Sequence, residues 1–561
     1  MHQDAFKTLA CAVVSIWMAV LSSPAFAAGT AERGMAFGLN GISDWSTQHP
    51  FIDLMKSARP WIGHLPGRWG GLEFETMLRN GVFDANGWPR RVPTEITKLE
   101  TLVLTDQPDD ASHLAGRYHV TFDGQGSLGV TGSGRVIKRG PGLRVFSYTP
   151  GAGAVGIAIS ATDVDDPIRN IRIVHERHLR HLGEEQVFNP LWLTHLQRTE
   201  TVRFMDWMDT NNSTVQTWED LPKTSDFSYA WRGVPLPVMI ELANRIGADA
   251  WFALPHLSND DLVRRFAQTV HDTLAPEQTV YVEYSNEVWN FIFHQAQWAS
   301  QQAEKLWGEI GDGWMQFYGM RSAEIMSIWT EVFGEEANAR LKRVVSVHTG
   351  WPELEKAALF GENATAALGR PPAEMFDAYA VTGYFGYELG EPATLQDVLD
   401  EAETAAELAG EAEGLSRVAL REYVQQHRFD DVLEFAETQV RDGSLRELTE
   451  TLWPYHAAAA RDAGLELIMY EGGTHAAATG ELHQDERLVA FLIAFNYSEQ
   501  MGTLYDEALA AWARFTDSPF NAFVDVAPPS QWGSWGALRH LNDDNPRWRA
   551  LKKHHSGQPG E

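Results

Sequence analysis

Residues 279–290 have the sequence TVYVEYSNEVWN, which predicts a buried β-strand over residues 279–284 and a polar turn directly after it. The strand is rich in β-branched and aromatic residues, and the Ser-Asn-Glu step ends it abruptly. The pattern recurs at residues 465–473, LELIMYEGG, where an apolar strand ends on a glutamate and two glycines. Long helical or loop sequence separates such strands, which is typical of a parallel sheet.

Eight segments along the chain fit this description, and each except the last is followed by helical or long loop sequence. Repeated strand–helix units of this number predict an α/β fold, a closed (β/α)8 TIM barrel. The competing fold is an open doubly wound sheet, which usually has a Gly-rich phosphate loop after its first strand; Gly38-Leu-Asn-Gly41 is not such a loop. The predicted strands are residues 35–40, 201–206, 250–254, 279–284, 343–347, 378–382, 465–470 and a short last one near 531–535.

An insertion interrupts the barrel pattern after its first unit. Residues 61–175 contain short, partly alternating apolar runs separated by Gly, Asp and Pro turns, which predicts an inserted β-sandwich-like domain. The barrel is then built from residues 28–60, as its first β/α unit, and residues 176–561. Two interpretations of the insert stay open: a carbohydrate-binding or cleft-wall module, and a purely structural accessory.

The N-terminus resembles an export signal. Lys7 precedes an apolar run from Leu9 to Leu21, and Ala25-Phe26-Ala27 has the small-x-small pattern of a signal peptidase site, which predicts a cleaved signal peptide over residues 1–27. Thr8 stands where a lipoprotein signal has an aliphatic residue, so we expect no membrane anchor. Cys11 is the single cysteine, so the mature chain is expected to lack disulfides, zinc–thiolate sites and cysteine catalysis. Such a chain suits a bacterial periplasm or the exterior.

Composition narrows the class of ligand. The net charge of −31 disfavours nucleic acid, anionic lipid and polyanionic substrates, and fits a neutral or weakly charged ligand. The 44% hydrophobic content is enough for a large core. The 21 tryptophans are numerous; core packing accounts for many, while flat indole faces also stack on sugar rings.

Two glutamates stand at predicted strand ends. Glu287 lies between aromatic and apolar neighbours, which should raise its pKa and favour the protonated form that a general acid needs. Glu471 directly follows an apolar strand, and the two glycines after it allow close approach of a substrate. Strand ends of a barrel converge on one face, so these two carboxyls are expected to meet there. Glycoside hydrolysis needs such a pair.

The order of these residues resembles clan A glycoside hydrolases, the superfamily that contains family 5. An Asn-Glu pair, Asn286 and Glu287, ends the fourth strand, and Glu471 ends the seventh. The resemblance covers the barrel and leaves the insert unexplained. It implies a retaining enzyme that uses Glu287 as acid/base and Glu471 as nucleophile, with the carboxyls about 5–5.5 Å apart. It also implies that Asn286 binds the sugar 2-hydroxyl.

Other strand-end residues match the same clan. Arg203 in the second strand resembles the arginine that keeps the nucleophile ionised, and His256 resembles a third-strand histidine of family 5. Tyr384 resembles the sixth-strand tyrosine that donates to the nucleophile. Family 5 usually has a histidine two residues before that tyrosine, where this chain has Thr382. The departure favours a divergent clan A family over family 5 itself.

Aromatic and histidine residues complete the predicted site. Trp532 or Trp535 resembles the eighth-strand tryptophan that floors the sugar site, and His348 at the end of the fifth strand is a candidate wall residue. The predicted substrate is a β-linked poly- or oligosaccharide, and the chemistry needs no metal or organic cofactor. The spacing of His175, His178 and His181 suits a metal, but no carboxylate-rich strand end accompanies it, so a polar connection into the barrel is favoured.

Two alternative functions remain. One is a non-catalytic polysaccharide-binding or matrix protein built on an inactive barrel, although both carboxylates are present. The other is a transglycosylase of the same clan, which would share every residue named above. The sugar, its linkage, endo or exo action and the oligomeric state are left open by the sequence.

Overall fold

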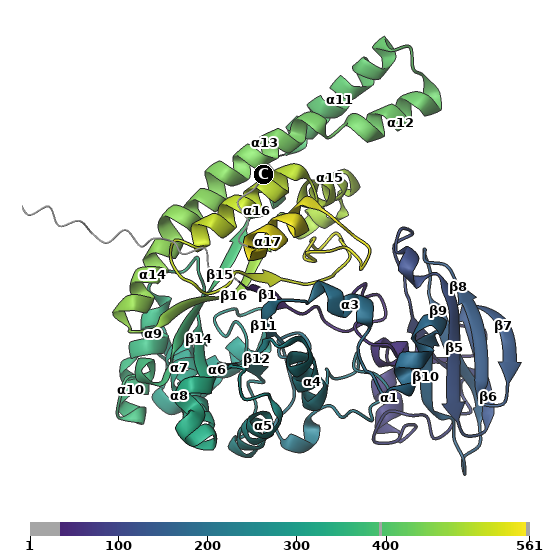
Figure 1. The fold of residues 1–561 in the computed structure, drawn as a ribbon, viewed down its shortest axis with the longest axis horizontal. Coiled ribbons are helices and arrows are strands. Elements are labelled where there is room, and N and C mark those ends of the chain that lie inside the picture. Colours follow the sequence, from purple (N-terminus) through teal and green to yellow (C-terminus); the bar gives the residue numbers. More distant parts are fainter. Residues whose placement is uncertain (1–33, 392–394, 557–561) are drawn as a thin grey trace, which may run out of the picture.

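The computed structural model describes residues 34–391 and 395–556 and has a closed eight-stranded parallel barrel at its centre (Figure 1). The predicted signal peptide, with Cys11, lies outside the described residues. The barrel closes where β1 pairs in parallel with both β11 and β17, so the predicted (β/α)8 fold is confirmed. The strands, in their order around the barrel, are β1 (Met35–Gly38), β11 (Thr199–Arg203), β12 (Asp249–Leu254), β13 (Val280–Tyr284), β14 (Leu341–Ser346), β15 (Ala378–Phe385), β16 (Glu466–Thr474) and β17 (Asn521–Phe523).

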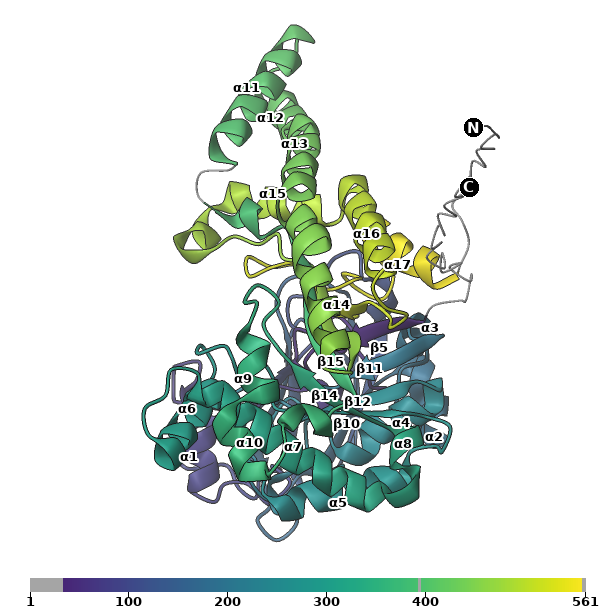
Figure 2. The ribbon, with the colours of Figure 1, turned by 90° about the vertical axis from the view of Figure 1, so that its left-hand side faces the viewer.

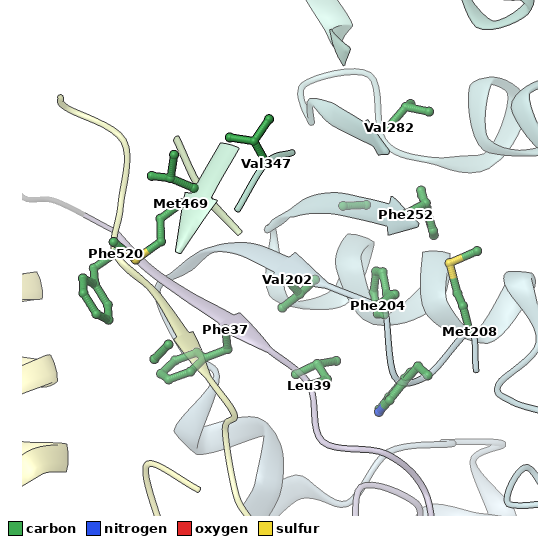
Figure 3. Packing of buried hydrophobic residues seen from close by; sticks show 14 of the residues in the cluster. Phe37, Leu39, Val202, Phe204, Met208, Phe252, Val282, Val347, Met469 and Phe520 are labelled. Atoms are coloured by element: carbon green, nitrogen blue, oxygen red, sulfur yellow. The ribbon is translucent and has the colours of Figure 1, made fainter. Parts of the chain in front are cut away.

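Alternation along the strands divides the core into two layers, because successive strand side chains point to opposite faces. Phe252 and its equivalents on other strands pack outward against the helices, as Figure 3 shows for Phe37, Val202 and Val282. Trp251 belongs to a smaller separate cluster that fills the barrel. The surrounding helices include α3 (Pro190–His195), α4 (Leu236–Ile246), α5 (Asp260–Thr273), α6 (His294–Trp307), α7 (Gly313–Phe333), α8 (Ala337–Arg340), α9 (Leu354–Phe360), α10 (Glu362–Leu368), α14 (Trp453–Asp462), α15 (Glu486–Asn496), α16 (Glu499–Trp512) and α17 (Pro546–Ser556).

The eighth strand is not where the sequence pattern placed it. It is the three-residue β17 at Asn521–Phe523, whereas the predicted segment near 531–535 forms a turn and a short connection. The two segments are adjacent, since the Val524 N–H donates to the Trp535 carbonyl at 2.9 Å. A strand of three residues is too short to show an alternating pattern. The first barrel unit, predicted over residues 28–60 with a helix after its strand, has one 3-10 turn there instead, Leu54–Ser57.

Between β1 and β11 the chain builds two antiparallel sheets with their own hydrophobic core, the sandwich at the right of Figure 1. One sheet has the order β10-β5-β8-β7 and the other β3-β2-β4-β9-β6. Two of the sandwich strands, β2 and β3, have only three and two residues, too few to show an alternating pattern, and a short helix, α1 (Phe74–Arg79), follows them. The strands are β2 (Ile62–His64), β3 (Gly71–Leu72), β4 (Lys98–Val103), β5 (Gly116–Asp123), β6 (Gly126–Gly132), β7 (Arg135–Gly140), β8 (Leu143–Tyr148), β9 (Val155–Thr162) and β10 (Arg169–His175).

Histidines gather where the sandwich meets the barrel. The ring of His113 lies 6.3 Å from the rings of both His49 and His540. A second row follows β10 into α2 (Leu179–Gly183), with His178 6.1 Å from His175 and 5.7 Å from His181 between ring centroids. Burial lowers the pKa of His49 to about 4, that of His113 to about 3 and that of His178 to about 4, which favours the neutral form of these three imidazoles.

A helical arm leaves the barrel after β15. It consists of α11 (Gln396–Ala412), α12 (Arg417–His427) and α13 (Asp430–Val440), and α13 leads back into α14 through two π-helical turns. Figures 1 and 2 show α11 and α12 projecting beyond the barrel as a hairpin. In the described part of the chain, no helix is long and apolar enough to cross a membrane.

Candidate active site

A cavity of about 760 Å³ opens at the carboxyl ends of the barrel strands. The turn after β13 and the ends of β15 and β16 supply its central polar side chains, and the π-helical turn Leu448–Leu452 contributes one wall. Glu287 and Glu471 both line this cavity. The two predicted carboxyls therefore line the same cavity, although they come from the fourth and seventh strands of the barrel, β13 and β16.

Glu287 is held by a strained turn. Ser285 (φ 62°) and Glu287 itself (φ 44°) both adopt left-handed backbone conformations, which cost of order 1–3 kcal/mol each in a non-glycine residue. The turn aims the side chain into the cavity, where the Asn290 amide donates to Glu287 Oε2 at 3.0 Å. Burial, reinforced by the charge of Glu471, raises the pKa of Glu287 to about 8. A carboxyl in this state keeps its proton at neutral pH.

Glu471 has a different environment. Arg203 Nη1 donates to Glu471 Oε1 at 2.7 Å, and the Tyr384 hydroxyl donates to Oε2 at 2.9 Å. Burial raises the pKa of Glu471, while the Arg203 charge and the Tyr384 hydrogen bond act in the opposite direction. Both oxygens of this carboxylate are thereby held, and the group is oriented within the cavity.

The two carboxyls divide one proton between them. Burial raises the pKa of both groups, the charge of Glu471 raises that of Glu287 further, and the charge of Glu283 raises that of Glu471. A state in which both carboxyls are ionised is therefore disfavoured. Glu471 accepts from a guanidinium and a phenol, whereas Glu287 accepts from a neutral amide. Charge-assisted hydrogen bonds are about twice as strong as neutral ones, so the negative charge stays on Glu471 and the proton on Glu287. This arrangement provides one acid and one base or nucleophile.

Arg203 is held inside the barrel by Glu283, a residue that was not predicted from the sequence. Glu283 on β13 is fully buried, and its Oε2 accepts from Arg203 Nη2 at 2.8 Å. The Trp251 indole donates to the same oxygen at 3.0 Å, and Ser346 Oγ donates to Oε1 at 2.7 Å. A charged residue inside an otherwise apolar strand was the available signal, because such a group must be paired to be buried.

Asn286 joins this network. Its Oδ1 accepts from Arg203 Nη2 at 2.8 Å, and its amide donates to Asn211 Oδ1 at 3.1 Å. The residue is 2% exposed, so its orientation is set by the protein. The structure thus brings together four of the predicted residues: Asn286, Arg203, Tyr384 and Glu471.

Trp535 and His348 also line the cavity. The Trp535 ring lies 6.2 Å from that of Tyr384 and 5.1 Å from that of His475, a further lining residue that was not predicted. His348 packs edge-on against Trp289 at 4.3 Å. Burial lowers the pKa of His348 and His475, which favours the neutral form of both rings.

The other two predicted residues lie elsewhere. His256 is not among the described residues that line this cavity; it is buried, 5.5 Å from the Trp298 ring, and its carbonyl accepts from the Tyr284 hydroxyl. Trp532 is 61% exposed, its ring lies tilted at 4.3 Å from that of His483, and it lines a neighbouring cavity rather than that of the carboxyl pair.

A second cavity, of about 520 Å³, adjoins the first and shares Trp535 with it. Its walls come mainly from the segments after β1, β11 and β17 and include Trp45, Asp206 and Trp532. Burial, together with the charge of Glu471, raises the pKa of Asp206 to about 7. The sequence pattern predicted a strand over residues 201–206, so Asp206 was not recognised as a residue that follows the end of β11.

The described residues, 34–391 and 395–556, contain many histidines and carboxylates, but their arrangement does not form a metal site. Within these residues no group of three or more His, Cys, Asp or Glu side chains is arranged to hold a metal ion. The row of His175, His178 and His181 belongs to the histidine junction described above, where the rings pack against one another.

No protein-family model and no curated protein matches the chain. Solved structures with some similarity include a β-galactosidase from the psychrophilic Marinomonas ef1 (10% identity, TM-score 0.30, 64% of this chain) and a family 5 glycoside hydrolase mannosidase from Rhizomucor miehei (10% identity, TM-score 0.29, 65% of this chain). The matches span 56% of the β-galactosidase and 86% of the mannosidase. An exo-β-agarase matches at 10% identity and TM-score 0.14, over 82% of this chain and 92% of that one.

Proposed function

We propose that the protein is a retaining glycoside hydrolase that cleaves β-glycosidic bonds of a poly- or oligosaccharide. Glu287 is the acid/base and Glu471 the nucleophile. The observation that carries the proposal is the unequal pair in one cavity: a carboxylate held by Arg203 and Tyr384, and a carboxyl whose pKa is raised to about 8. Glycoside hydrolysis by double displacement requires this division of roles.

In the first step Glu471 attacks the sugar C1 while Glu287 transfers its proton to the leaving oxygen. The C1–O bond to the leaving sugar breaks, and a covalent glycosyl–Glu471 ester forms. In the second step the Glu287 carboxylate removes a proton from water as the water oxygen attacks C1. This step breaks the ester, restores the Glu471 carboxylate and returns the proton to Glu287.

The neighbouring groups fit this sequence. Arg203 and Tyr384 keep the carboxylate of Glu471 ionised and oriented until attack, and Asn286, oriented by Arg203, is positioned to bind a sugar hydroxyl. Trp535 at the cavity wall supplies a flat apolar face for a sugar ring.

The test is release of reducing ends from a panel of β-linked glycans. We expect Glu471→Gln and Glu287→Gln each to lower the rate by about 10²–10⁴-fold, the range of a lost acid–base or equivalent catalytic group. Glu466→Gln is the matched control, because Glu466 lies at the other end of the same strand, β16, and pairs with Lys342. It should retain wild-type activity.

Product stereochemistry, followed by NMR immediately after mixing, tests the nucleophile role. Retention at C1 is expected, and inversion would refute a covalent intermediate on Glu471. Glycan binding with no turnover by the wild type would favour the non-catalytic binding protein, and longer products at high substrate concentration would favour a transglycosylase.

We further propose that the chain is exported with removal of residues 1–27. The basis is the sequence pattern ending at Ala27. Expression of the full chain in a Gram-negative host, followed by N-terminal sequencing of the periplasmic fraction, should give a chain that begins at Ala28; retention of Met1 in the cytoplasm would contradict it.

A further inference from the structure

The cavity beyond Trp535 extends the site to one side of the catalytic pair. Trp535 lines both cavities, so the two are neighbours separated by one indole. Trp45 and Trp532 line the second cavity and are 54% and 61% exposed. Large aromatic side chains this exposed leave apolar area in water, which proteins usually avoid unless it binds something.

Both rings are held in place from one side. The Arg59 guanidinium lies 5.5 Å from the Trp45 ring centre, and His483 lies 4.3 Å from that of Trp532. A ring packed on one face and open on the other is a preorganised platform, so binding to it costs little side-chain entropy. We refer to Trp45 and Trp532 as the Trp45 side.

A second aromatic group lies at the other side of the catalytic pair. Phe291 directly follows Asn290 and Trp351 directly follows Gly350, and both of these neighbours line the cavity of Glu287. Phe291 and Trp351 are each 49% exposed, and Trp314 lies between them, 5.5 Å and 6.1 Å from their rings. Phe291, Trp314 and Trp351 are here called the Trp314 side.

The two sides come from different parts of the barrel. The Trp45 side is built from segments that follow β1 and β17, and the Trp314 side from segments that follow β13 and β14 together with the start of α7. The catalytic cavity lies between them, since its lining includes Trp535 at one end and Asn290 and Gly350 at the other.

The two adjoining cavities together form a cleft, and the charge of its lining restricts which ligands can bind there. Its lining contains the carboxyls of Asp206, Asp209, Glu287, Glu447 and Glu471, and no Lys or Arg is among the described residues that line either cavity. Carboxyl groups accept hydrogen bonds from sugar hydroxyls but repel anionic sugars. The net charge of −31 acts in the same direction.

We propose that the protein binds an extended, uncharged polysaccharide chain across the whole cleft, with the Trp45 side and the Trp314 side each holding sugar rings on opposite sides of the scissile bond. The inference rests on the proposed hydrolase function for the position of that bond. Because the chain continues in both directions from the catalytic pair, the enzyme cuts internal bonds. Half-exposed aromatics at both sides leave room for the chain to pass, whereas an enzyme acting from a chain end needs a wall at one side.

The experiment compares solution viscosity with reducing-end release for soluble galactomannan, mixed-linkage β-glucan and xylan. We expect the wild type to lower the viscosity of at least one polymer long before many ends appear. The double variants Trp45→Ala/Trp532→Ala and Phe291→Ala/Trp351→Ala should each lower kcat/KM on that polymer about tenfold or more, with a smaller loss on short oligosaccharides. A carboxymethylated form of the same polymer should be cut more slowly than the neutral form.

Trp69→Ala is the matched control, since Trp69 is 63% exposed in the sandwich and lines neither cavity among the described residues. It should leave activity unchanged. Equal loss in Trp69→Ala, or steady release of one short product with viscosity falling in proportion to the ends formed, would overturn the proposal.

A binding measurement separates this inference from the proposed function. Affinity gel electrophoresis of Glu471→Gln in each neutral polymer should show retardation that both double variants, made in the same background, reduce. Retardation of this kind without turnover by the wild type would support extended binding and refute the hydrolase. No retardation in any polymer, together with no turnover, would refute the extended binding itself.

Discussion

Tyr384→Phe removes one hydrogen bond from the proposed nucleophile and little else. The lost contact is the 2.9 Å bond from the Tyr384 hydroxyl to Glu471 Oε2, which lies at the wall of the catalytic cavity. A hydrogen bond to a charged partner contributes about 1.5–3 kcal/mol. Because the bond favours the ionised form, its loss should raise the pKa of Glu471 by about one to two pH units.

The assay is the pH dependence of kcat/KM on an aryl β-glycoside that the wild type cleaves. Glu471 must be ionised to attack, so activity falls as pH drops through its pKa, and the acid limb should move one to two units upward, by about the amount just estimated. Tyr470→Phe is the control: the Tyr470 hydroxyl is buried without a hydrogen-bond partner in the described structure, and its ring lies 5.2 Å from Arg203. That variant should leave the limb in place.

Two results would refute the reasoning. An acid limb that stays fixed in Tyr384→Phe would show that the bond does not set the ionisation of Glu471. An equal shift in Tyr470→Phe would show that any phenol next to the site has the same effect. Thermal unfolding of both variants distinguishes either outcome from a general loss of structure.

Three further predictions concern ionisable groups. Glu283→Gln removes a charge that raises the pKa of Glu471, so the acid limb should move downward, opposite to Tyr384→Phe; an upward shift would contradict the network. The proposed acid Glu287 has its pKa raised to about 8, so kcat/KM should fall as pH rises through about 8, and a flat profile to pH 10 would exclude it. Burial lowers the pKa of His49 from 6.5 to about 4, so the unfolded chain binds more protons in that window and the free energy of unfolding should fall by about 3 kcal/mol from pH 6.5 to 4. Urea unfolding at several pH values should show a smaller loss for His49→Gln, and equal losses would refute the contribution of His49.

The residues of the site that could be predicted from the sequence are those that lie at the ends of recognisable barrel strands. Glu287, Glu471, Arg203 and Tyr384 lie after or at the end of strands whose apolar pattern is long enough to recognise, so the barrel geometry places them together. His256 followed the same logic, yet the chain after β12 carries its ring away from the cavity toward α6. A loop's direction after the last strand residue depends on packing partners far along the sequence.

Residues supplied by irregular or very short segments escaped prediction. Trp45 and Trp351 stand in loops, and β17 has three residues, so neither periodicity nor propensity marks them. Glu283 was missed for another reason. It lies within a strand, and whether its side chain points into the barrel or outward can be told only from the closed barrel, in which it pairs with Arg203. Long elements were therefore predictable, and the positions that depend on how they meet were not.

The insertion of the sandwich into the barrel has a consequence for how the chain is made. The first barrel strand, β1, pairs with β11, 161 residues later, and with β17, whose first residue comes 483 positions after Gly38. At a synthesis rate of about 5–20 residues per second, β1 waits roughly 25–100 seconds for its last partner. Throughout that time at least one of its edges has unpaired backbone N–H and C=O groups, which favours pairing with other chains. The sandwich, complete by His175, can fold in the interval, so a folded domain stands beside β1 while the barrel is still open.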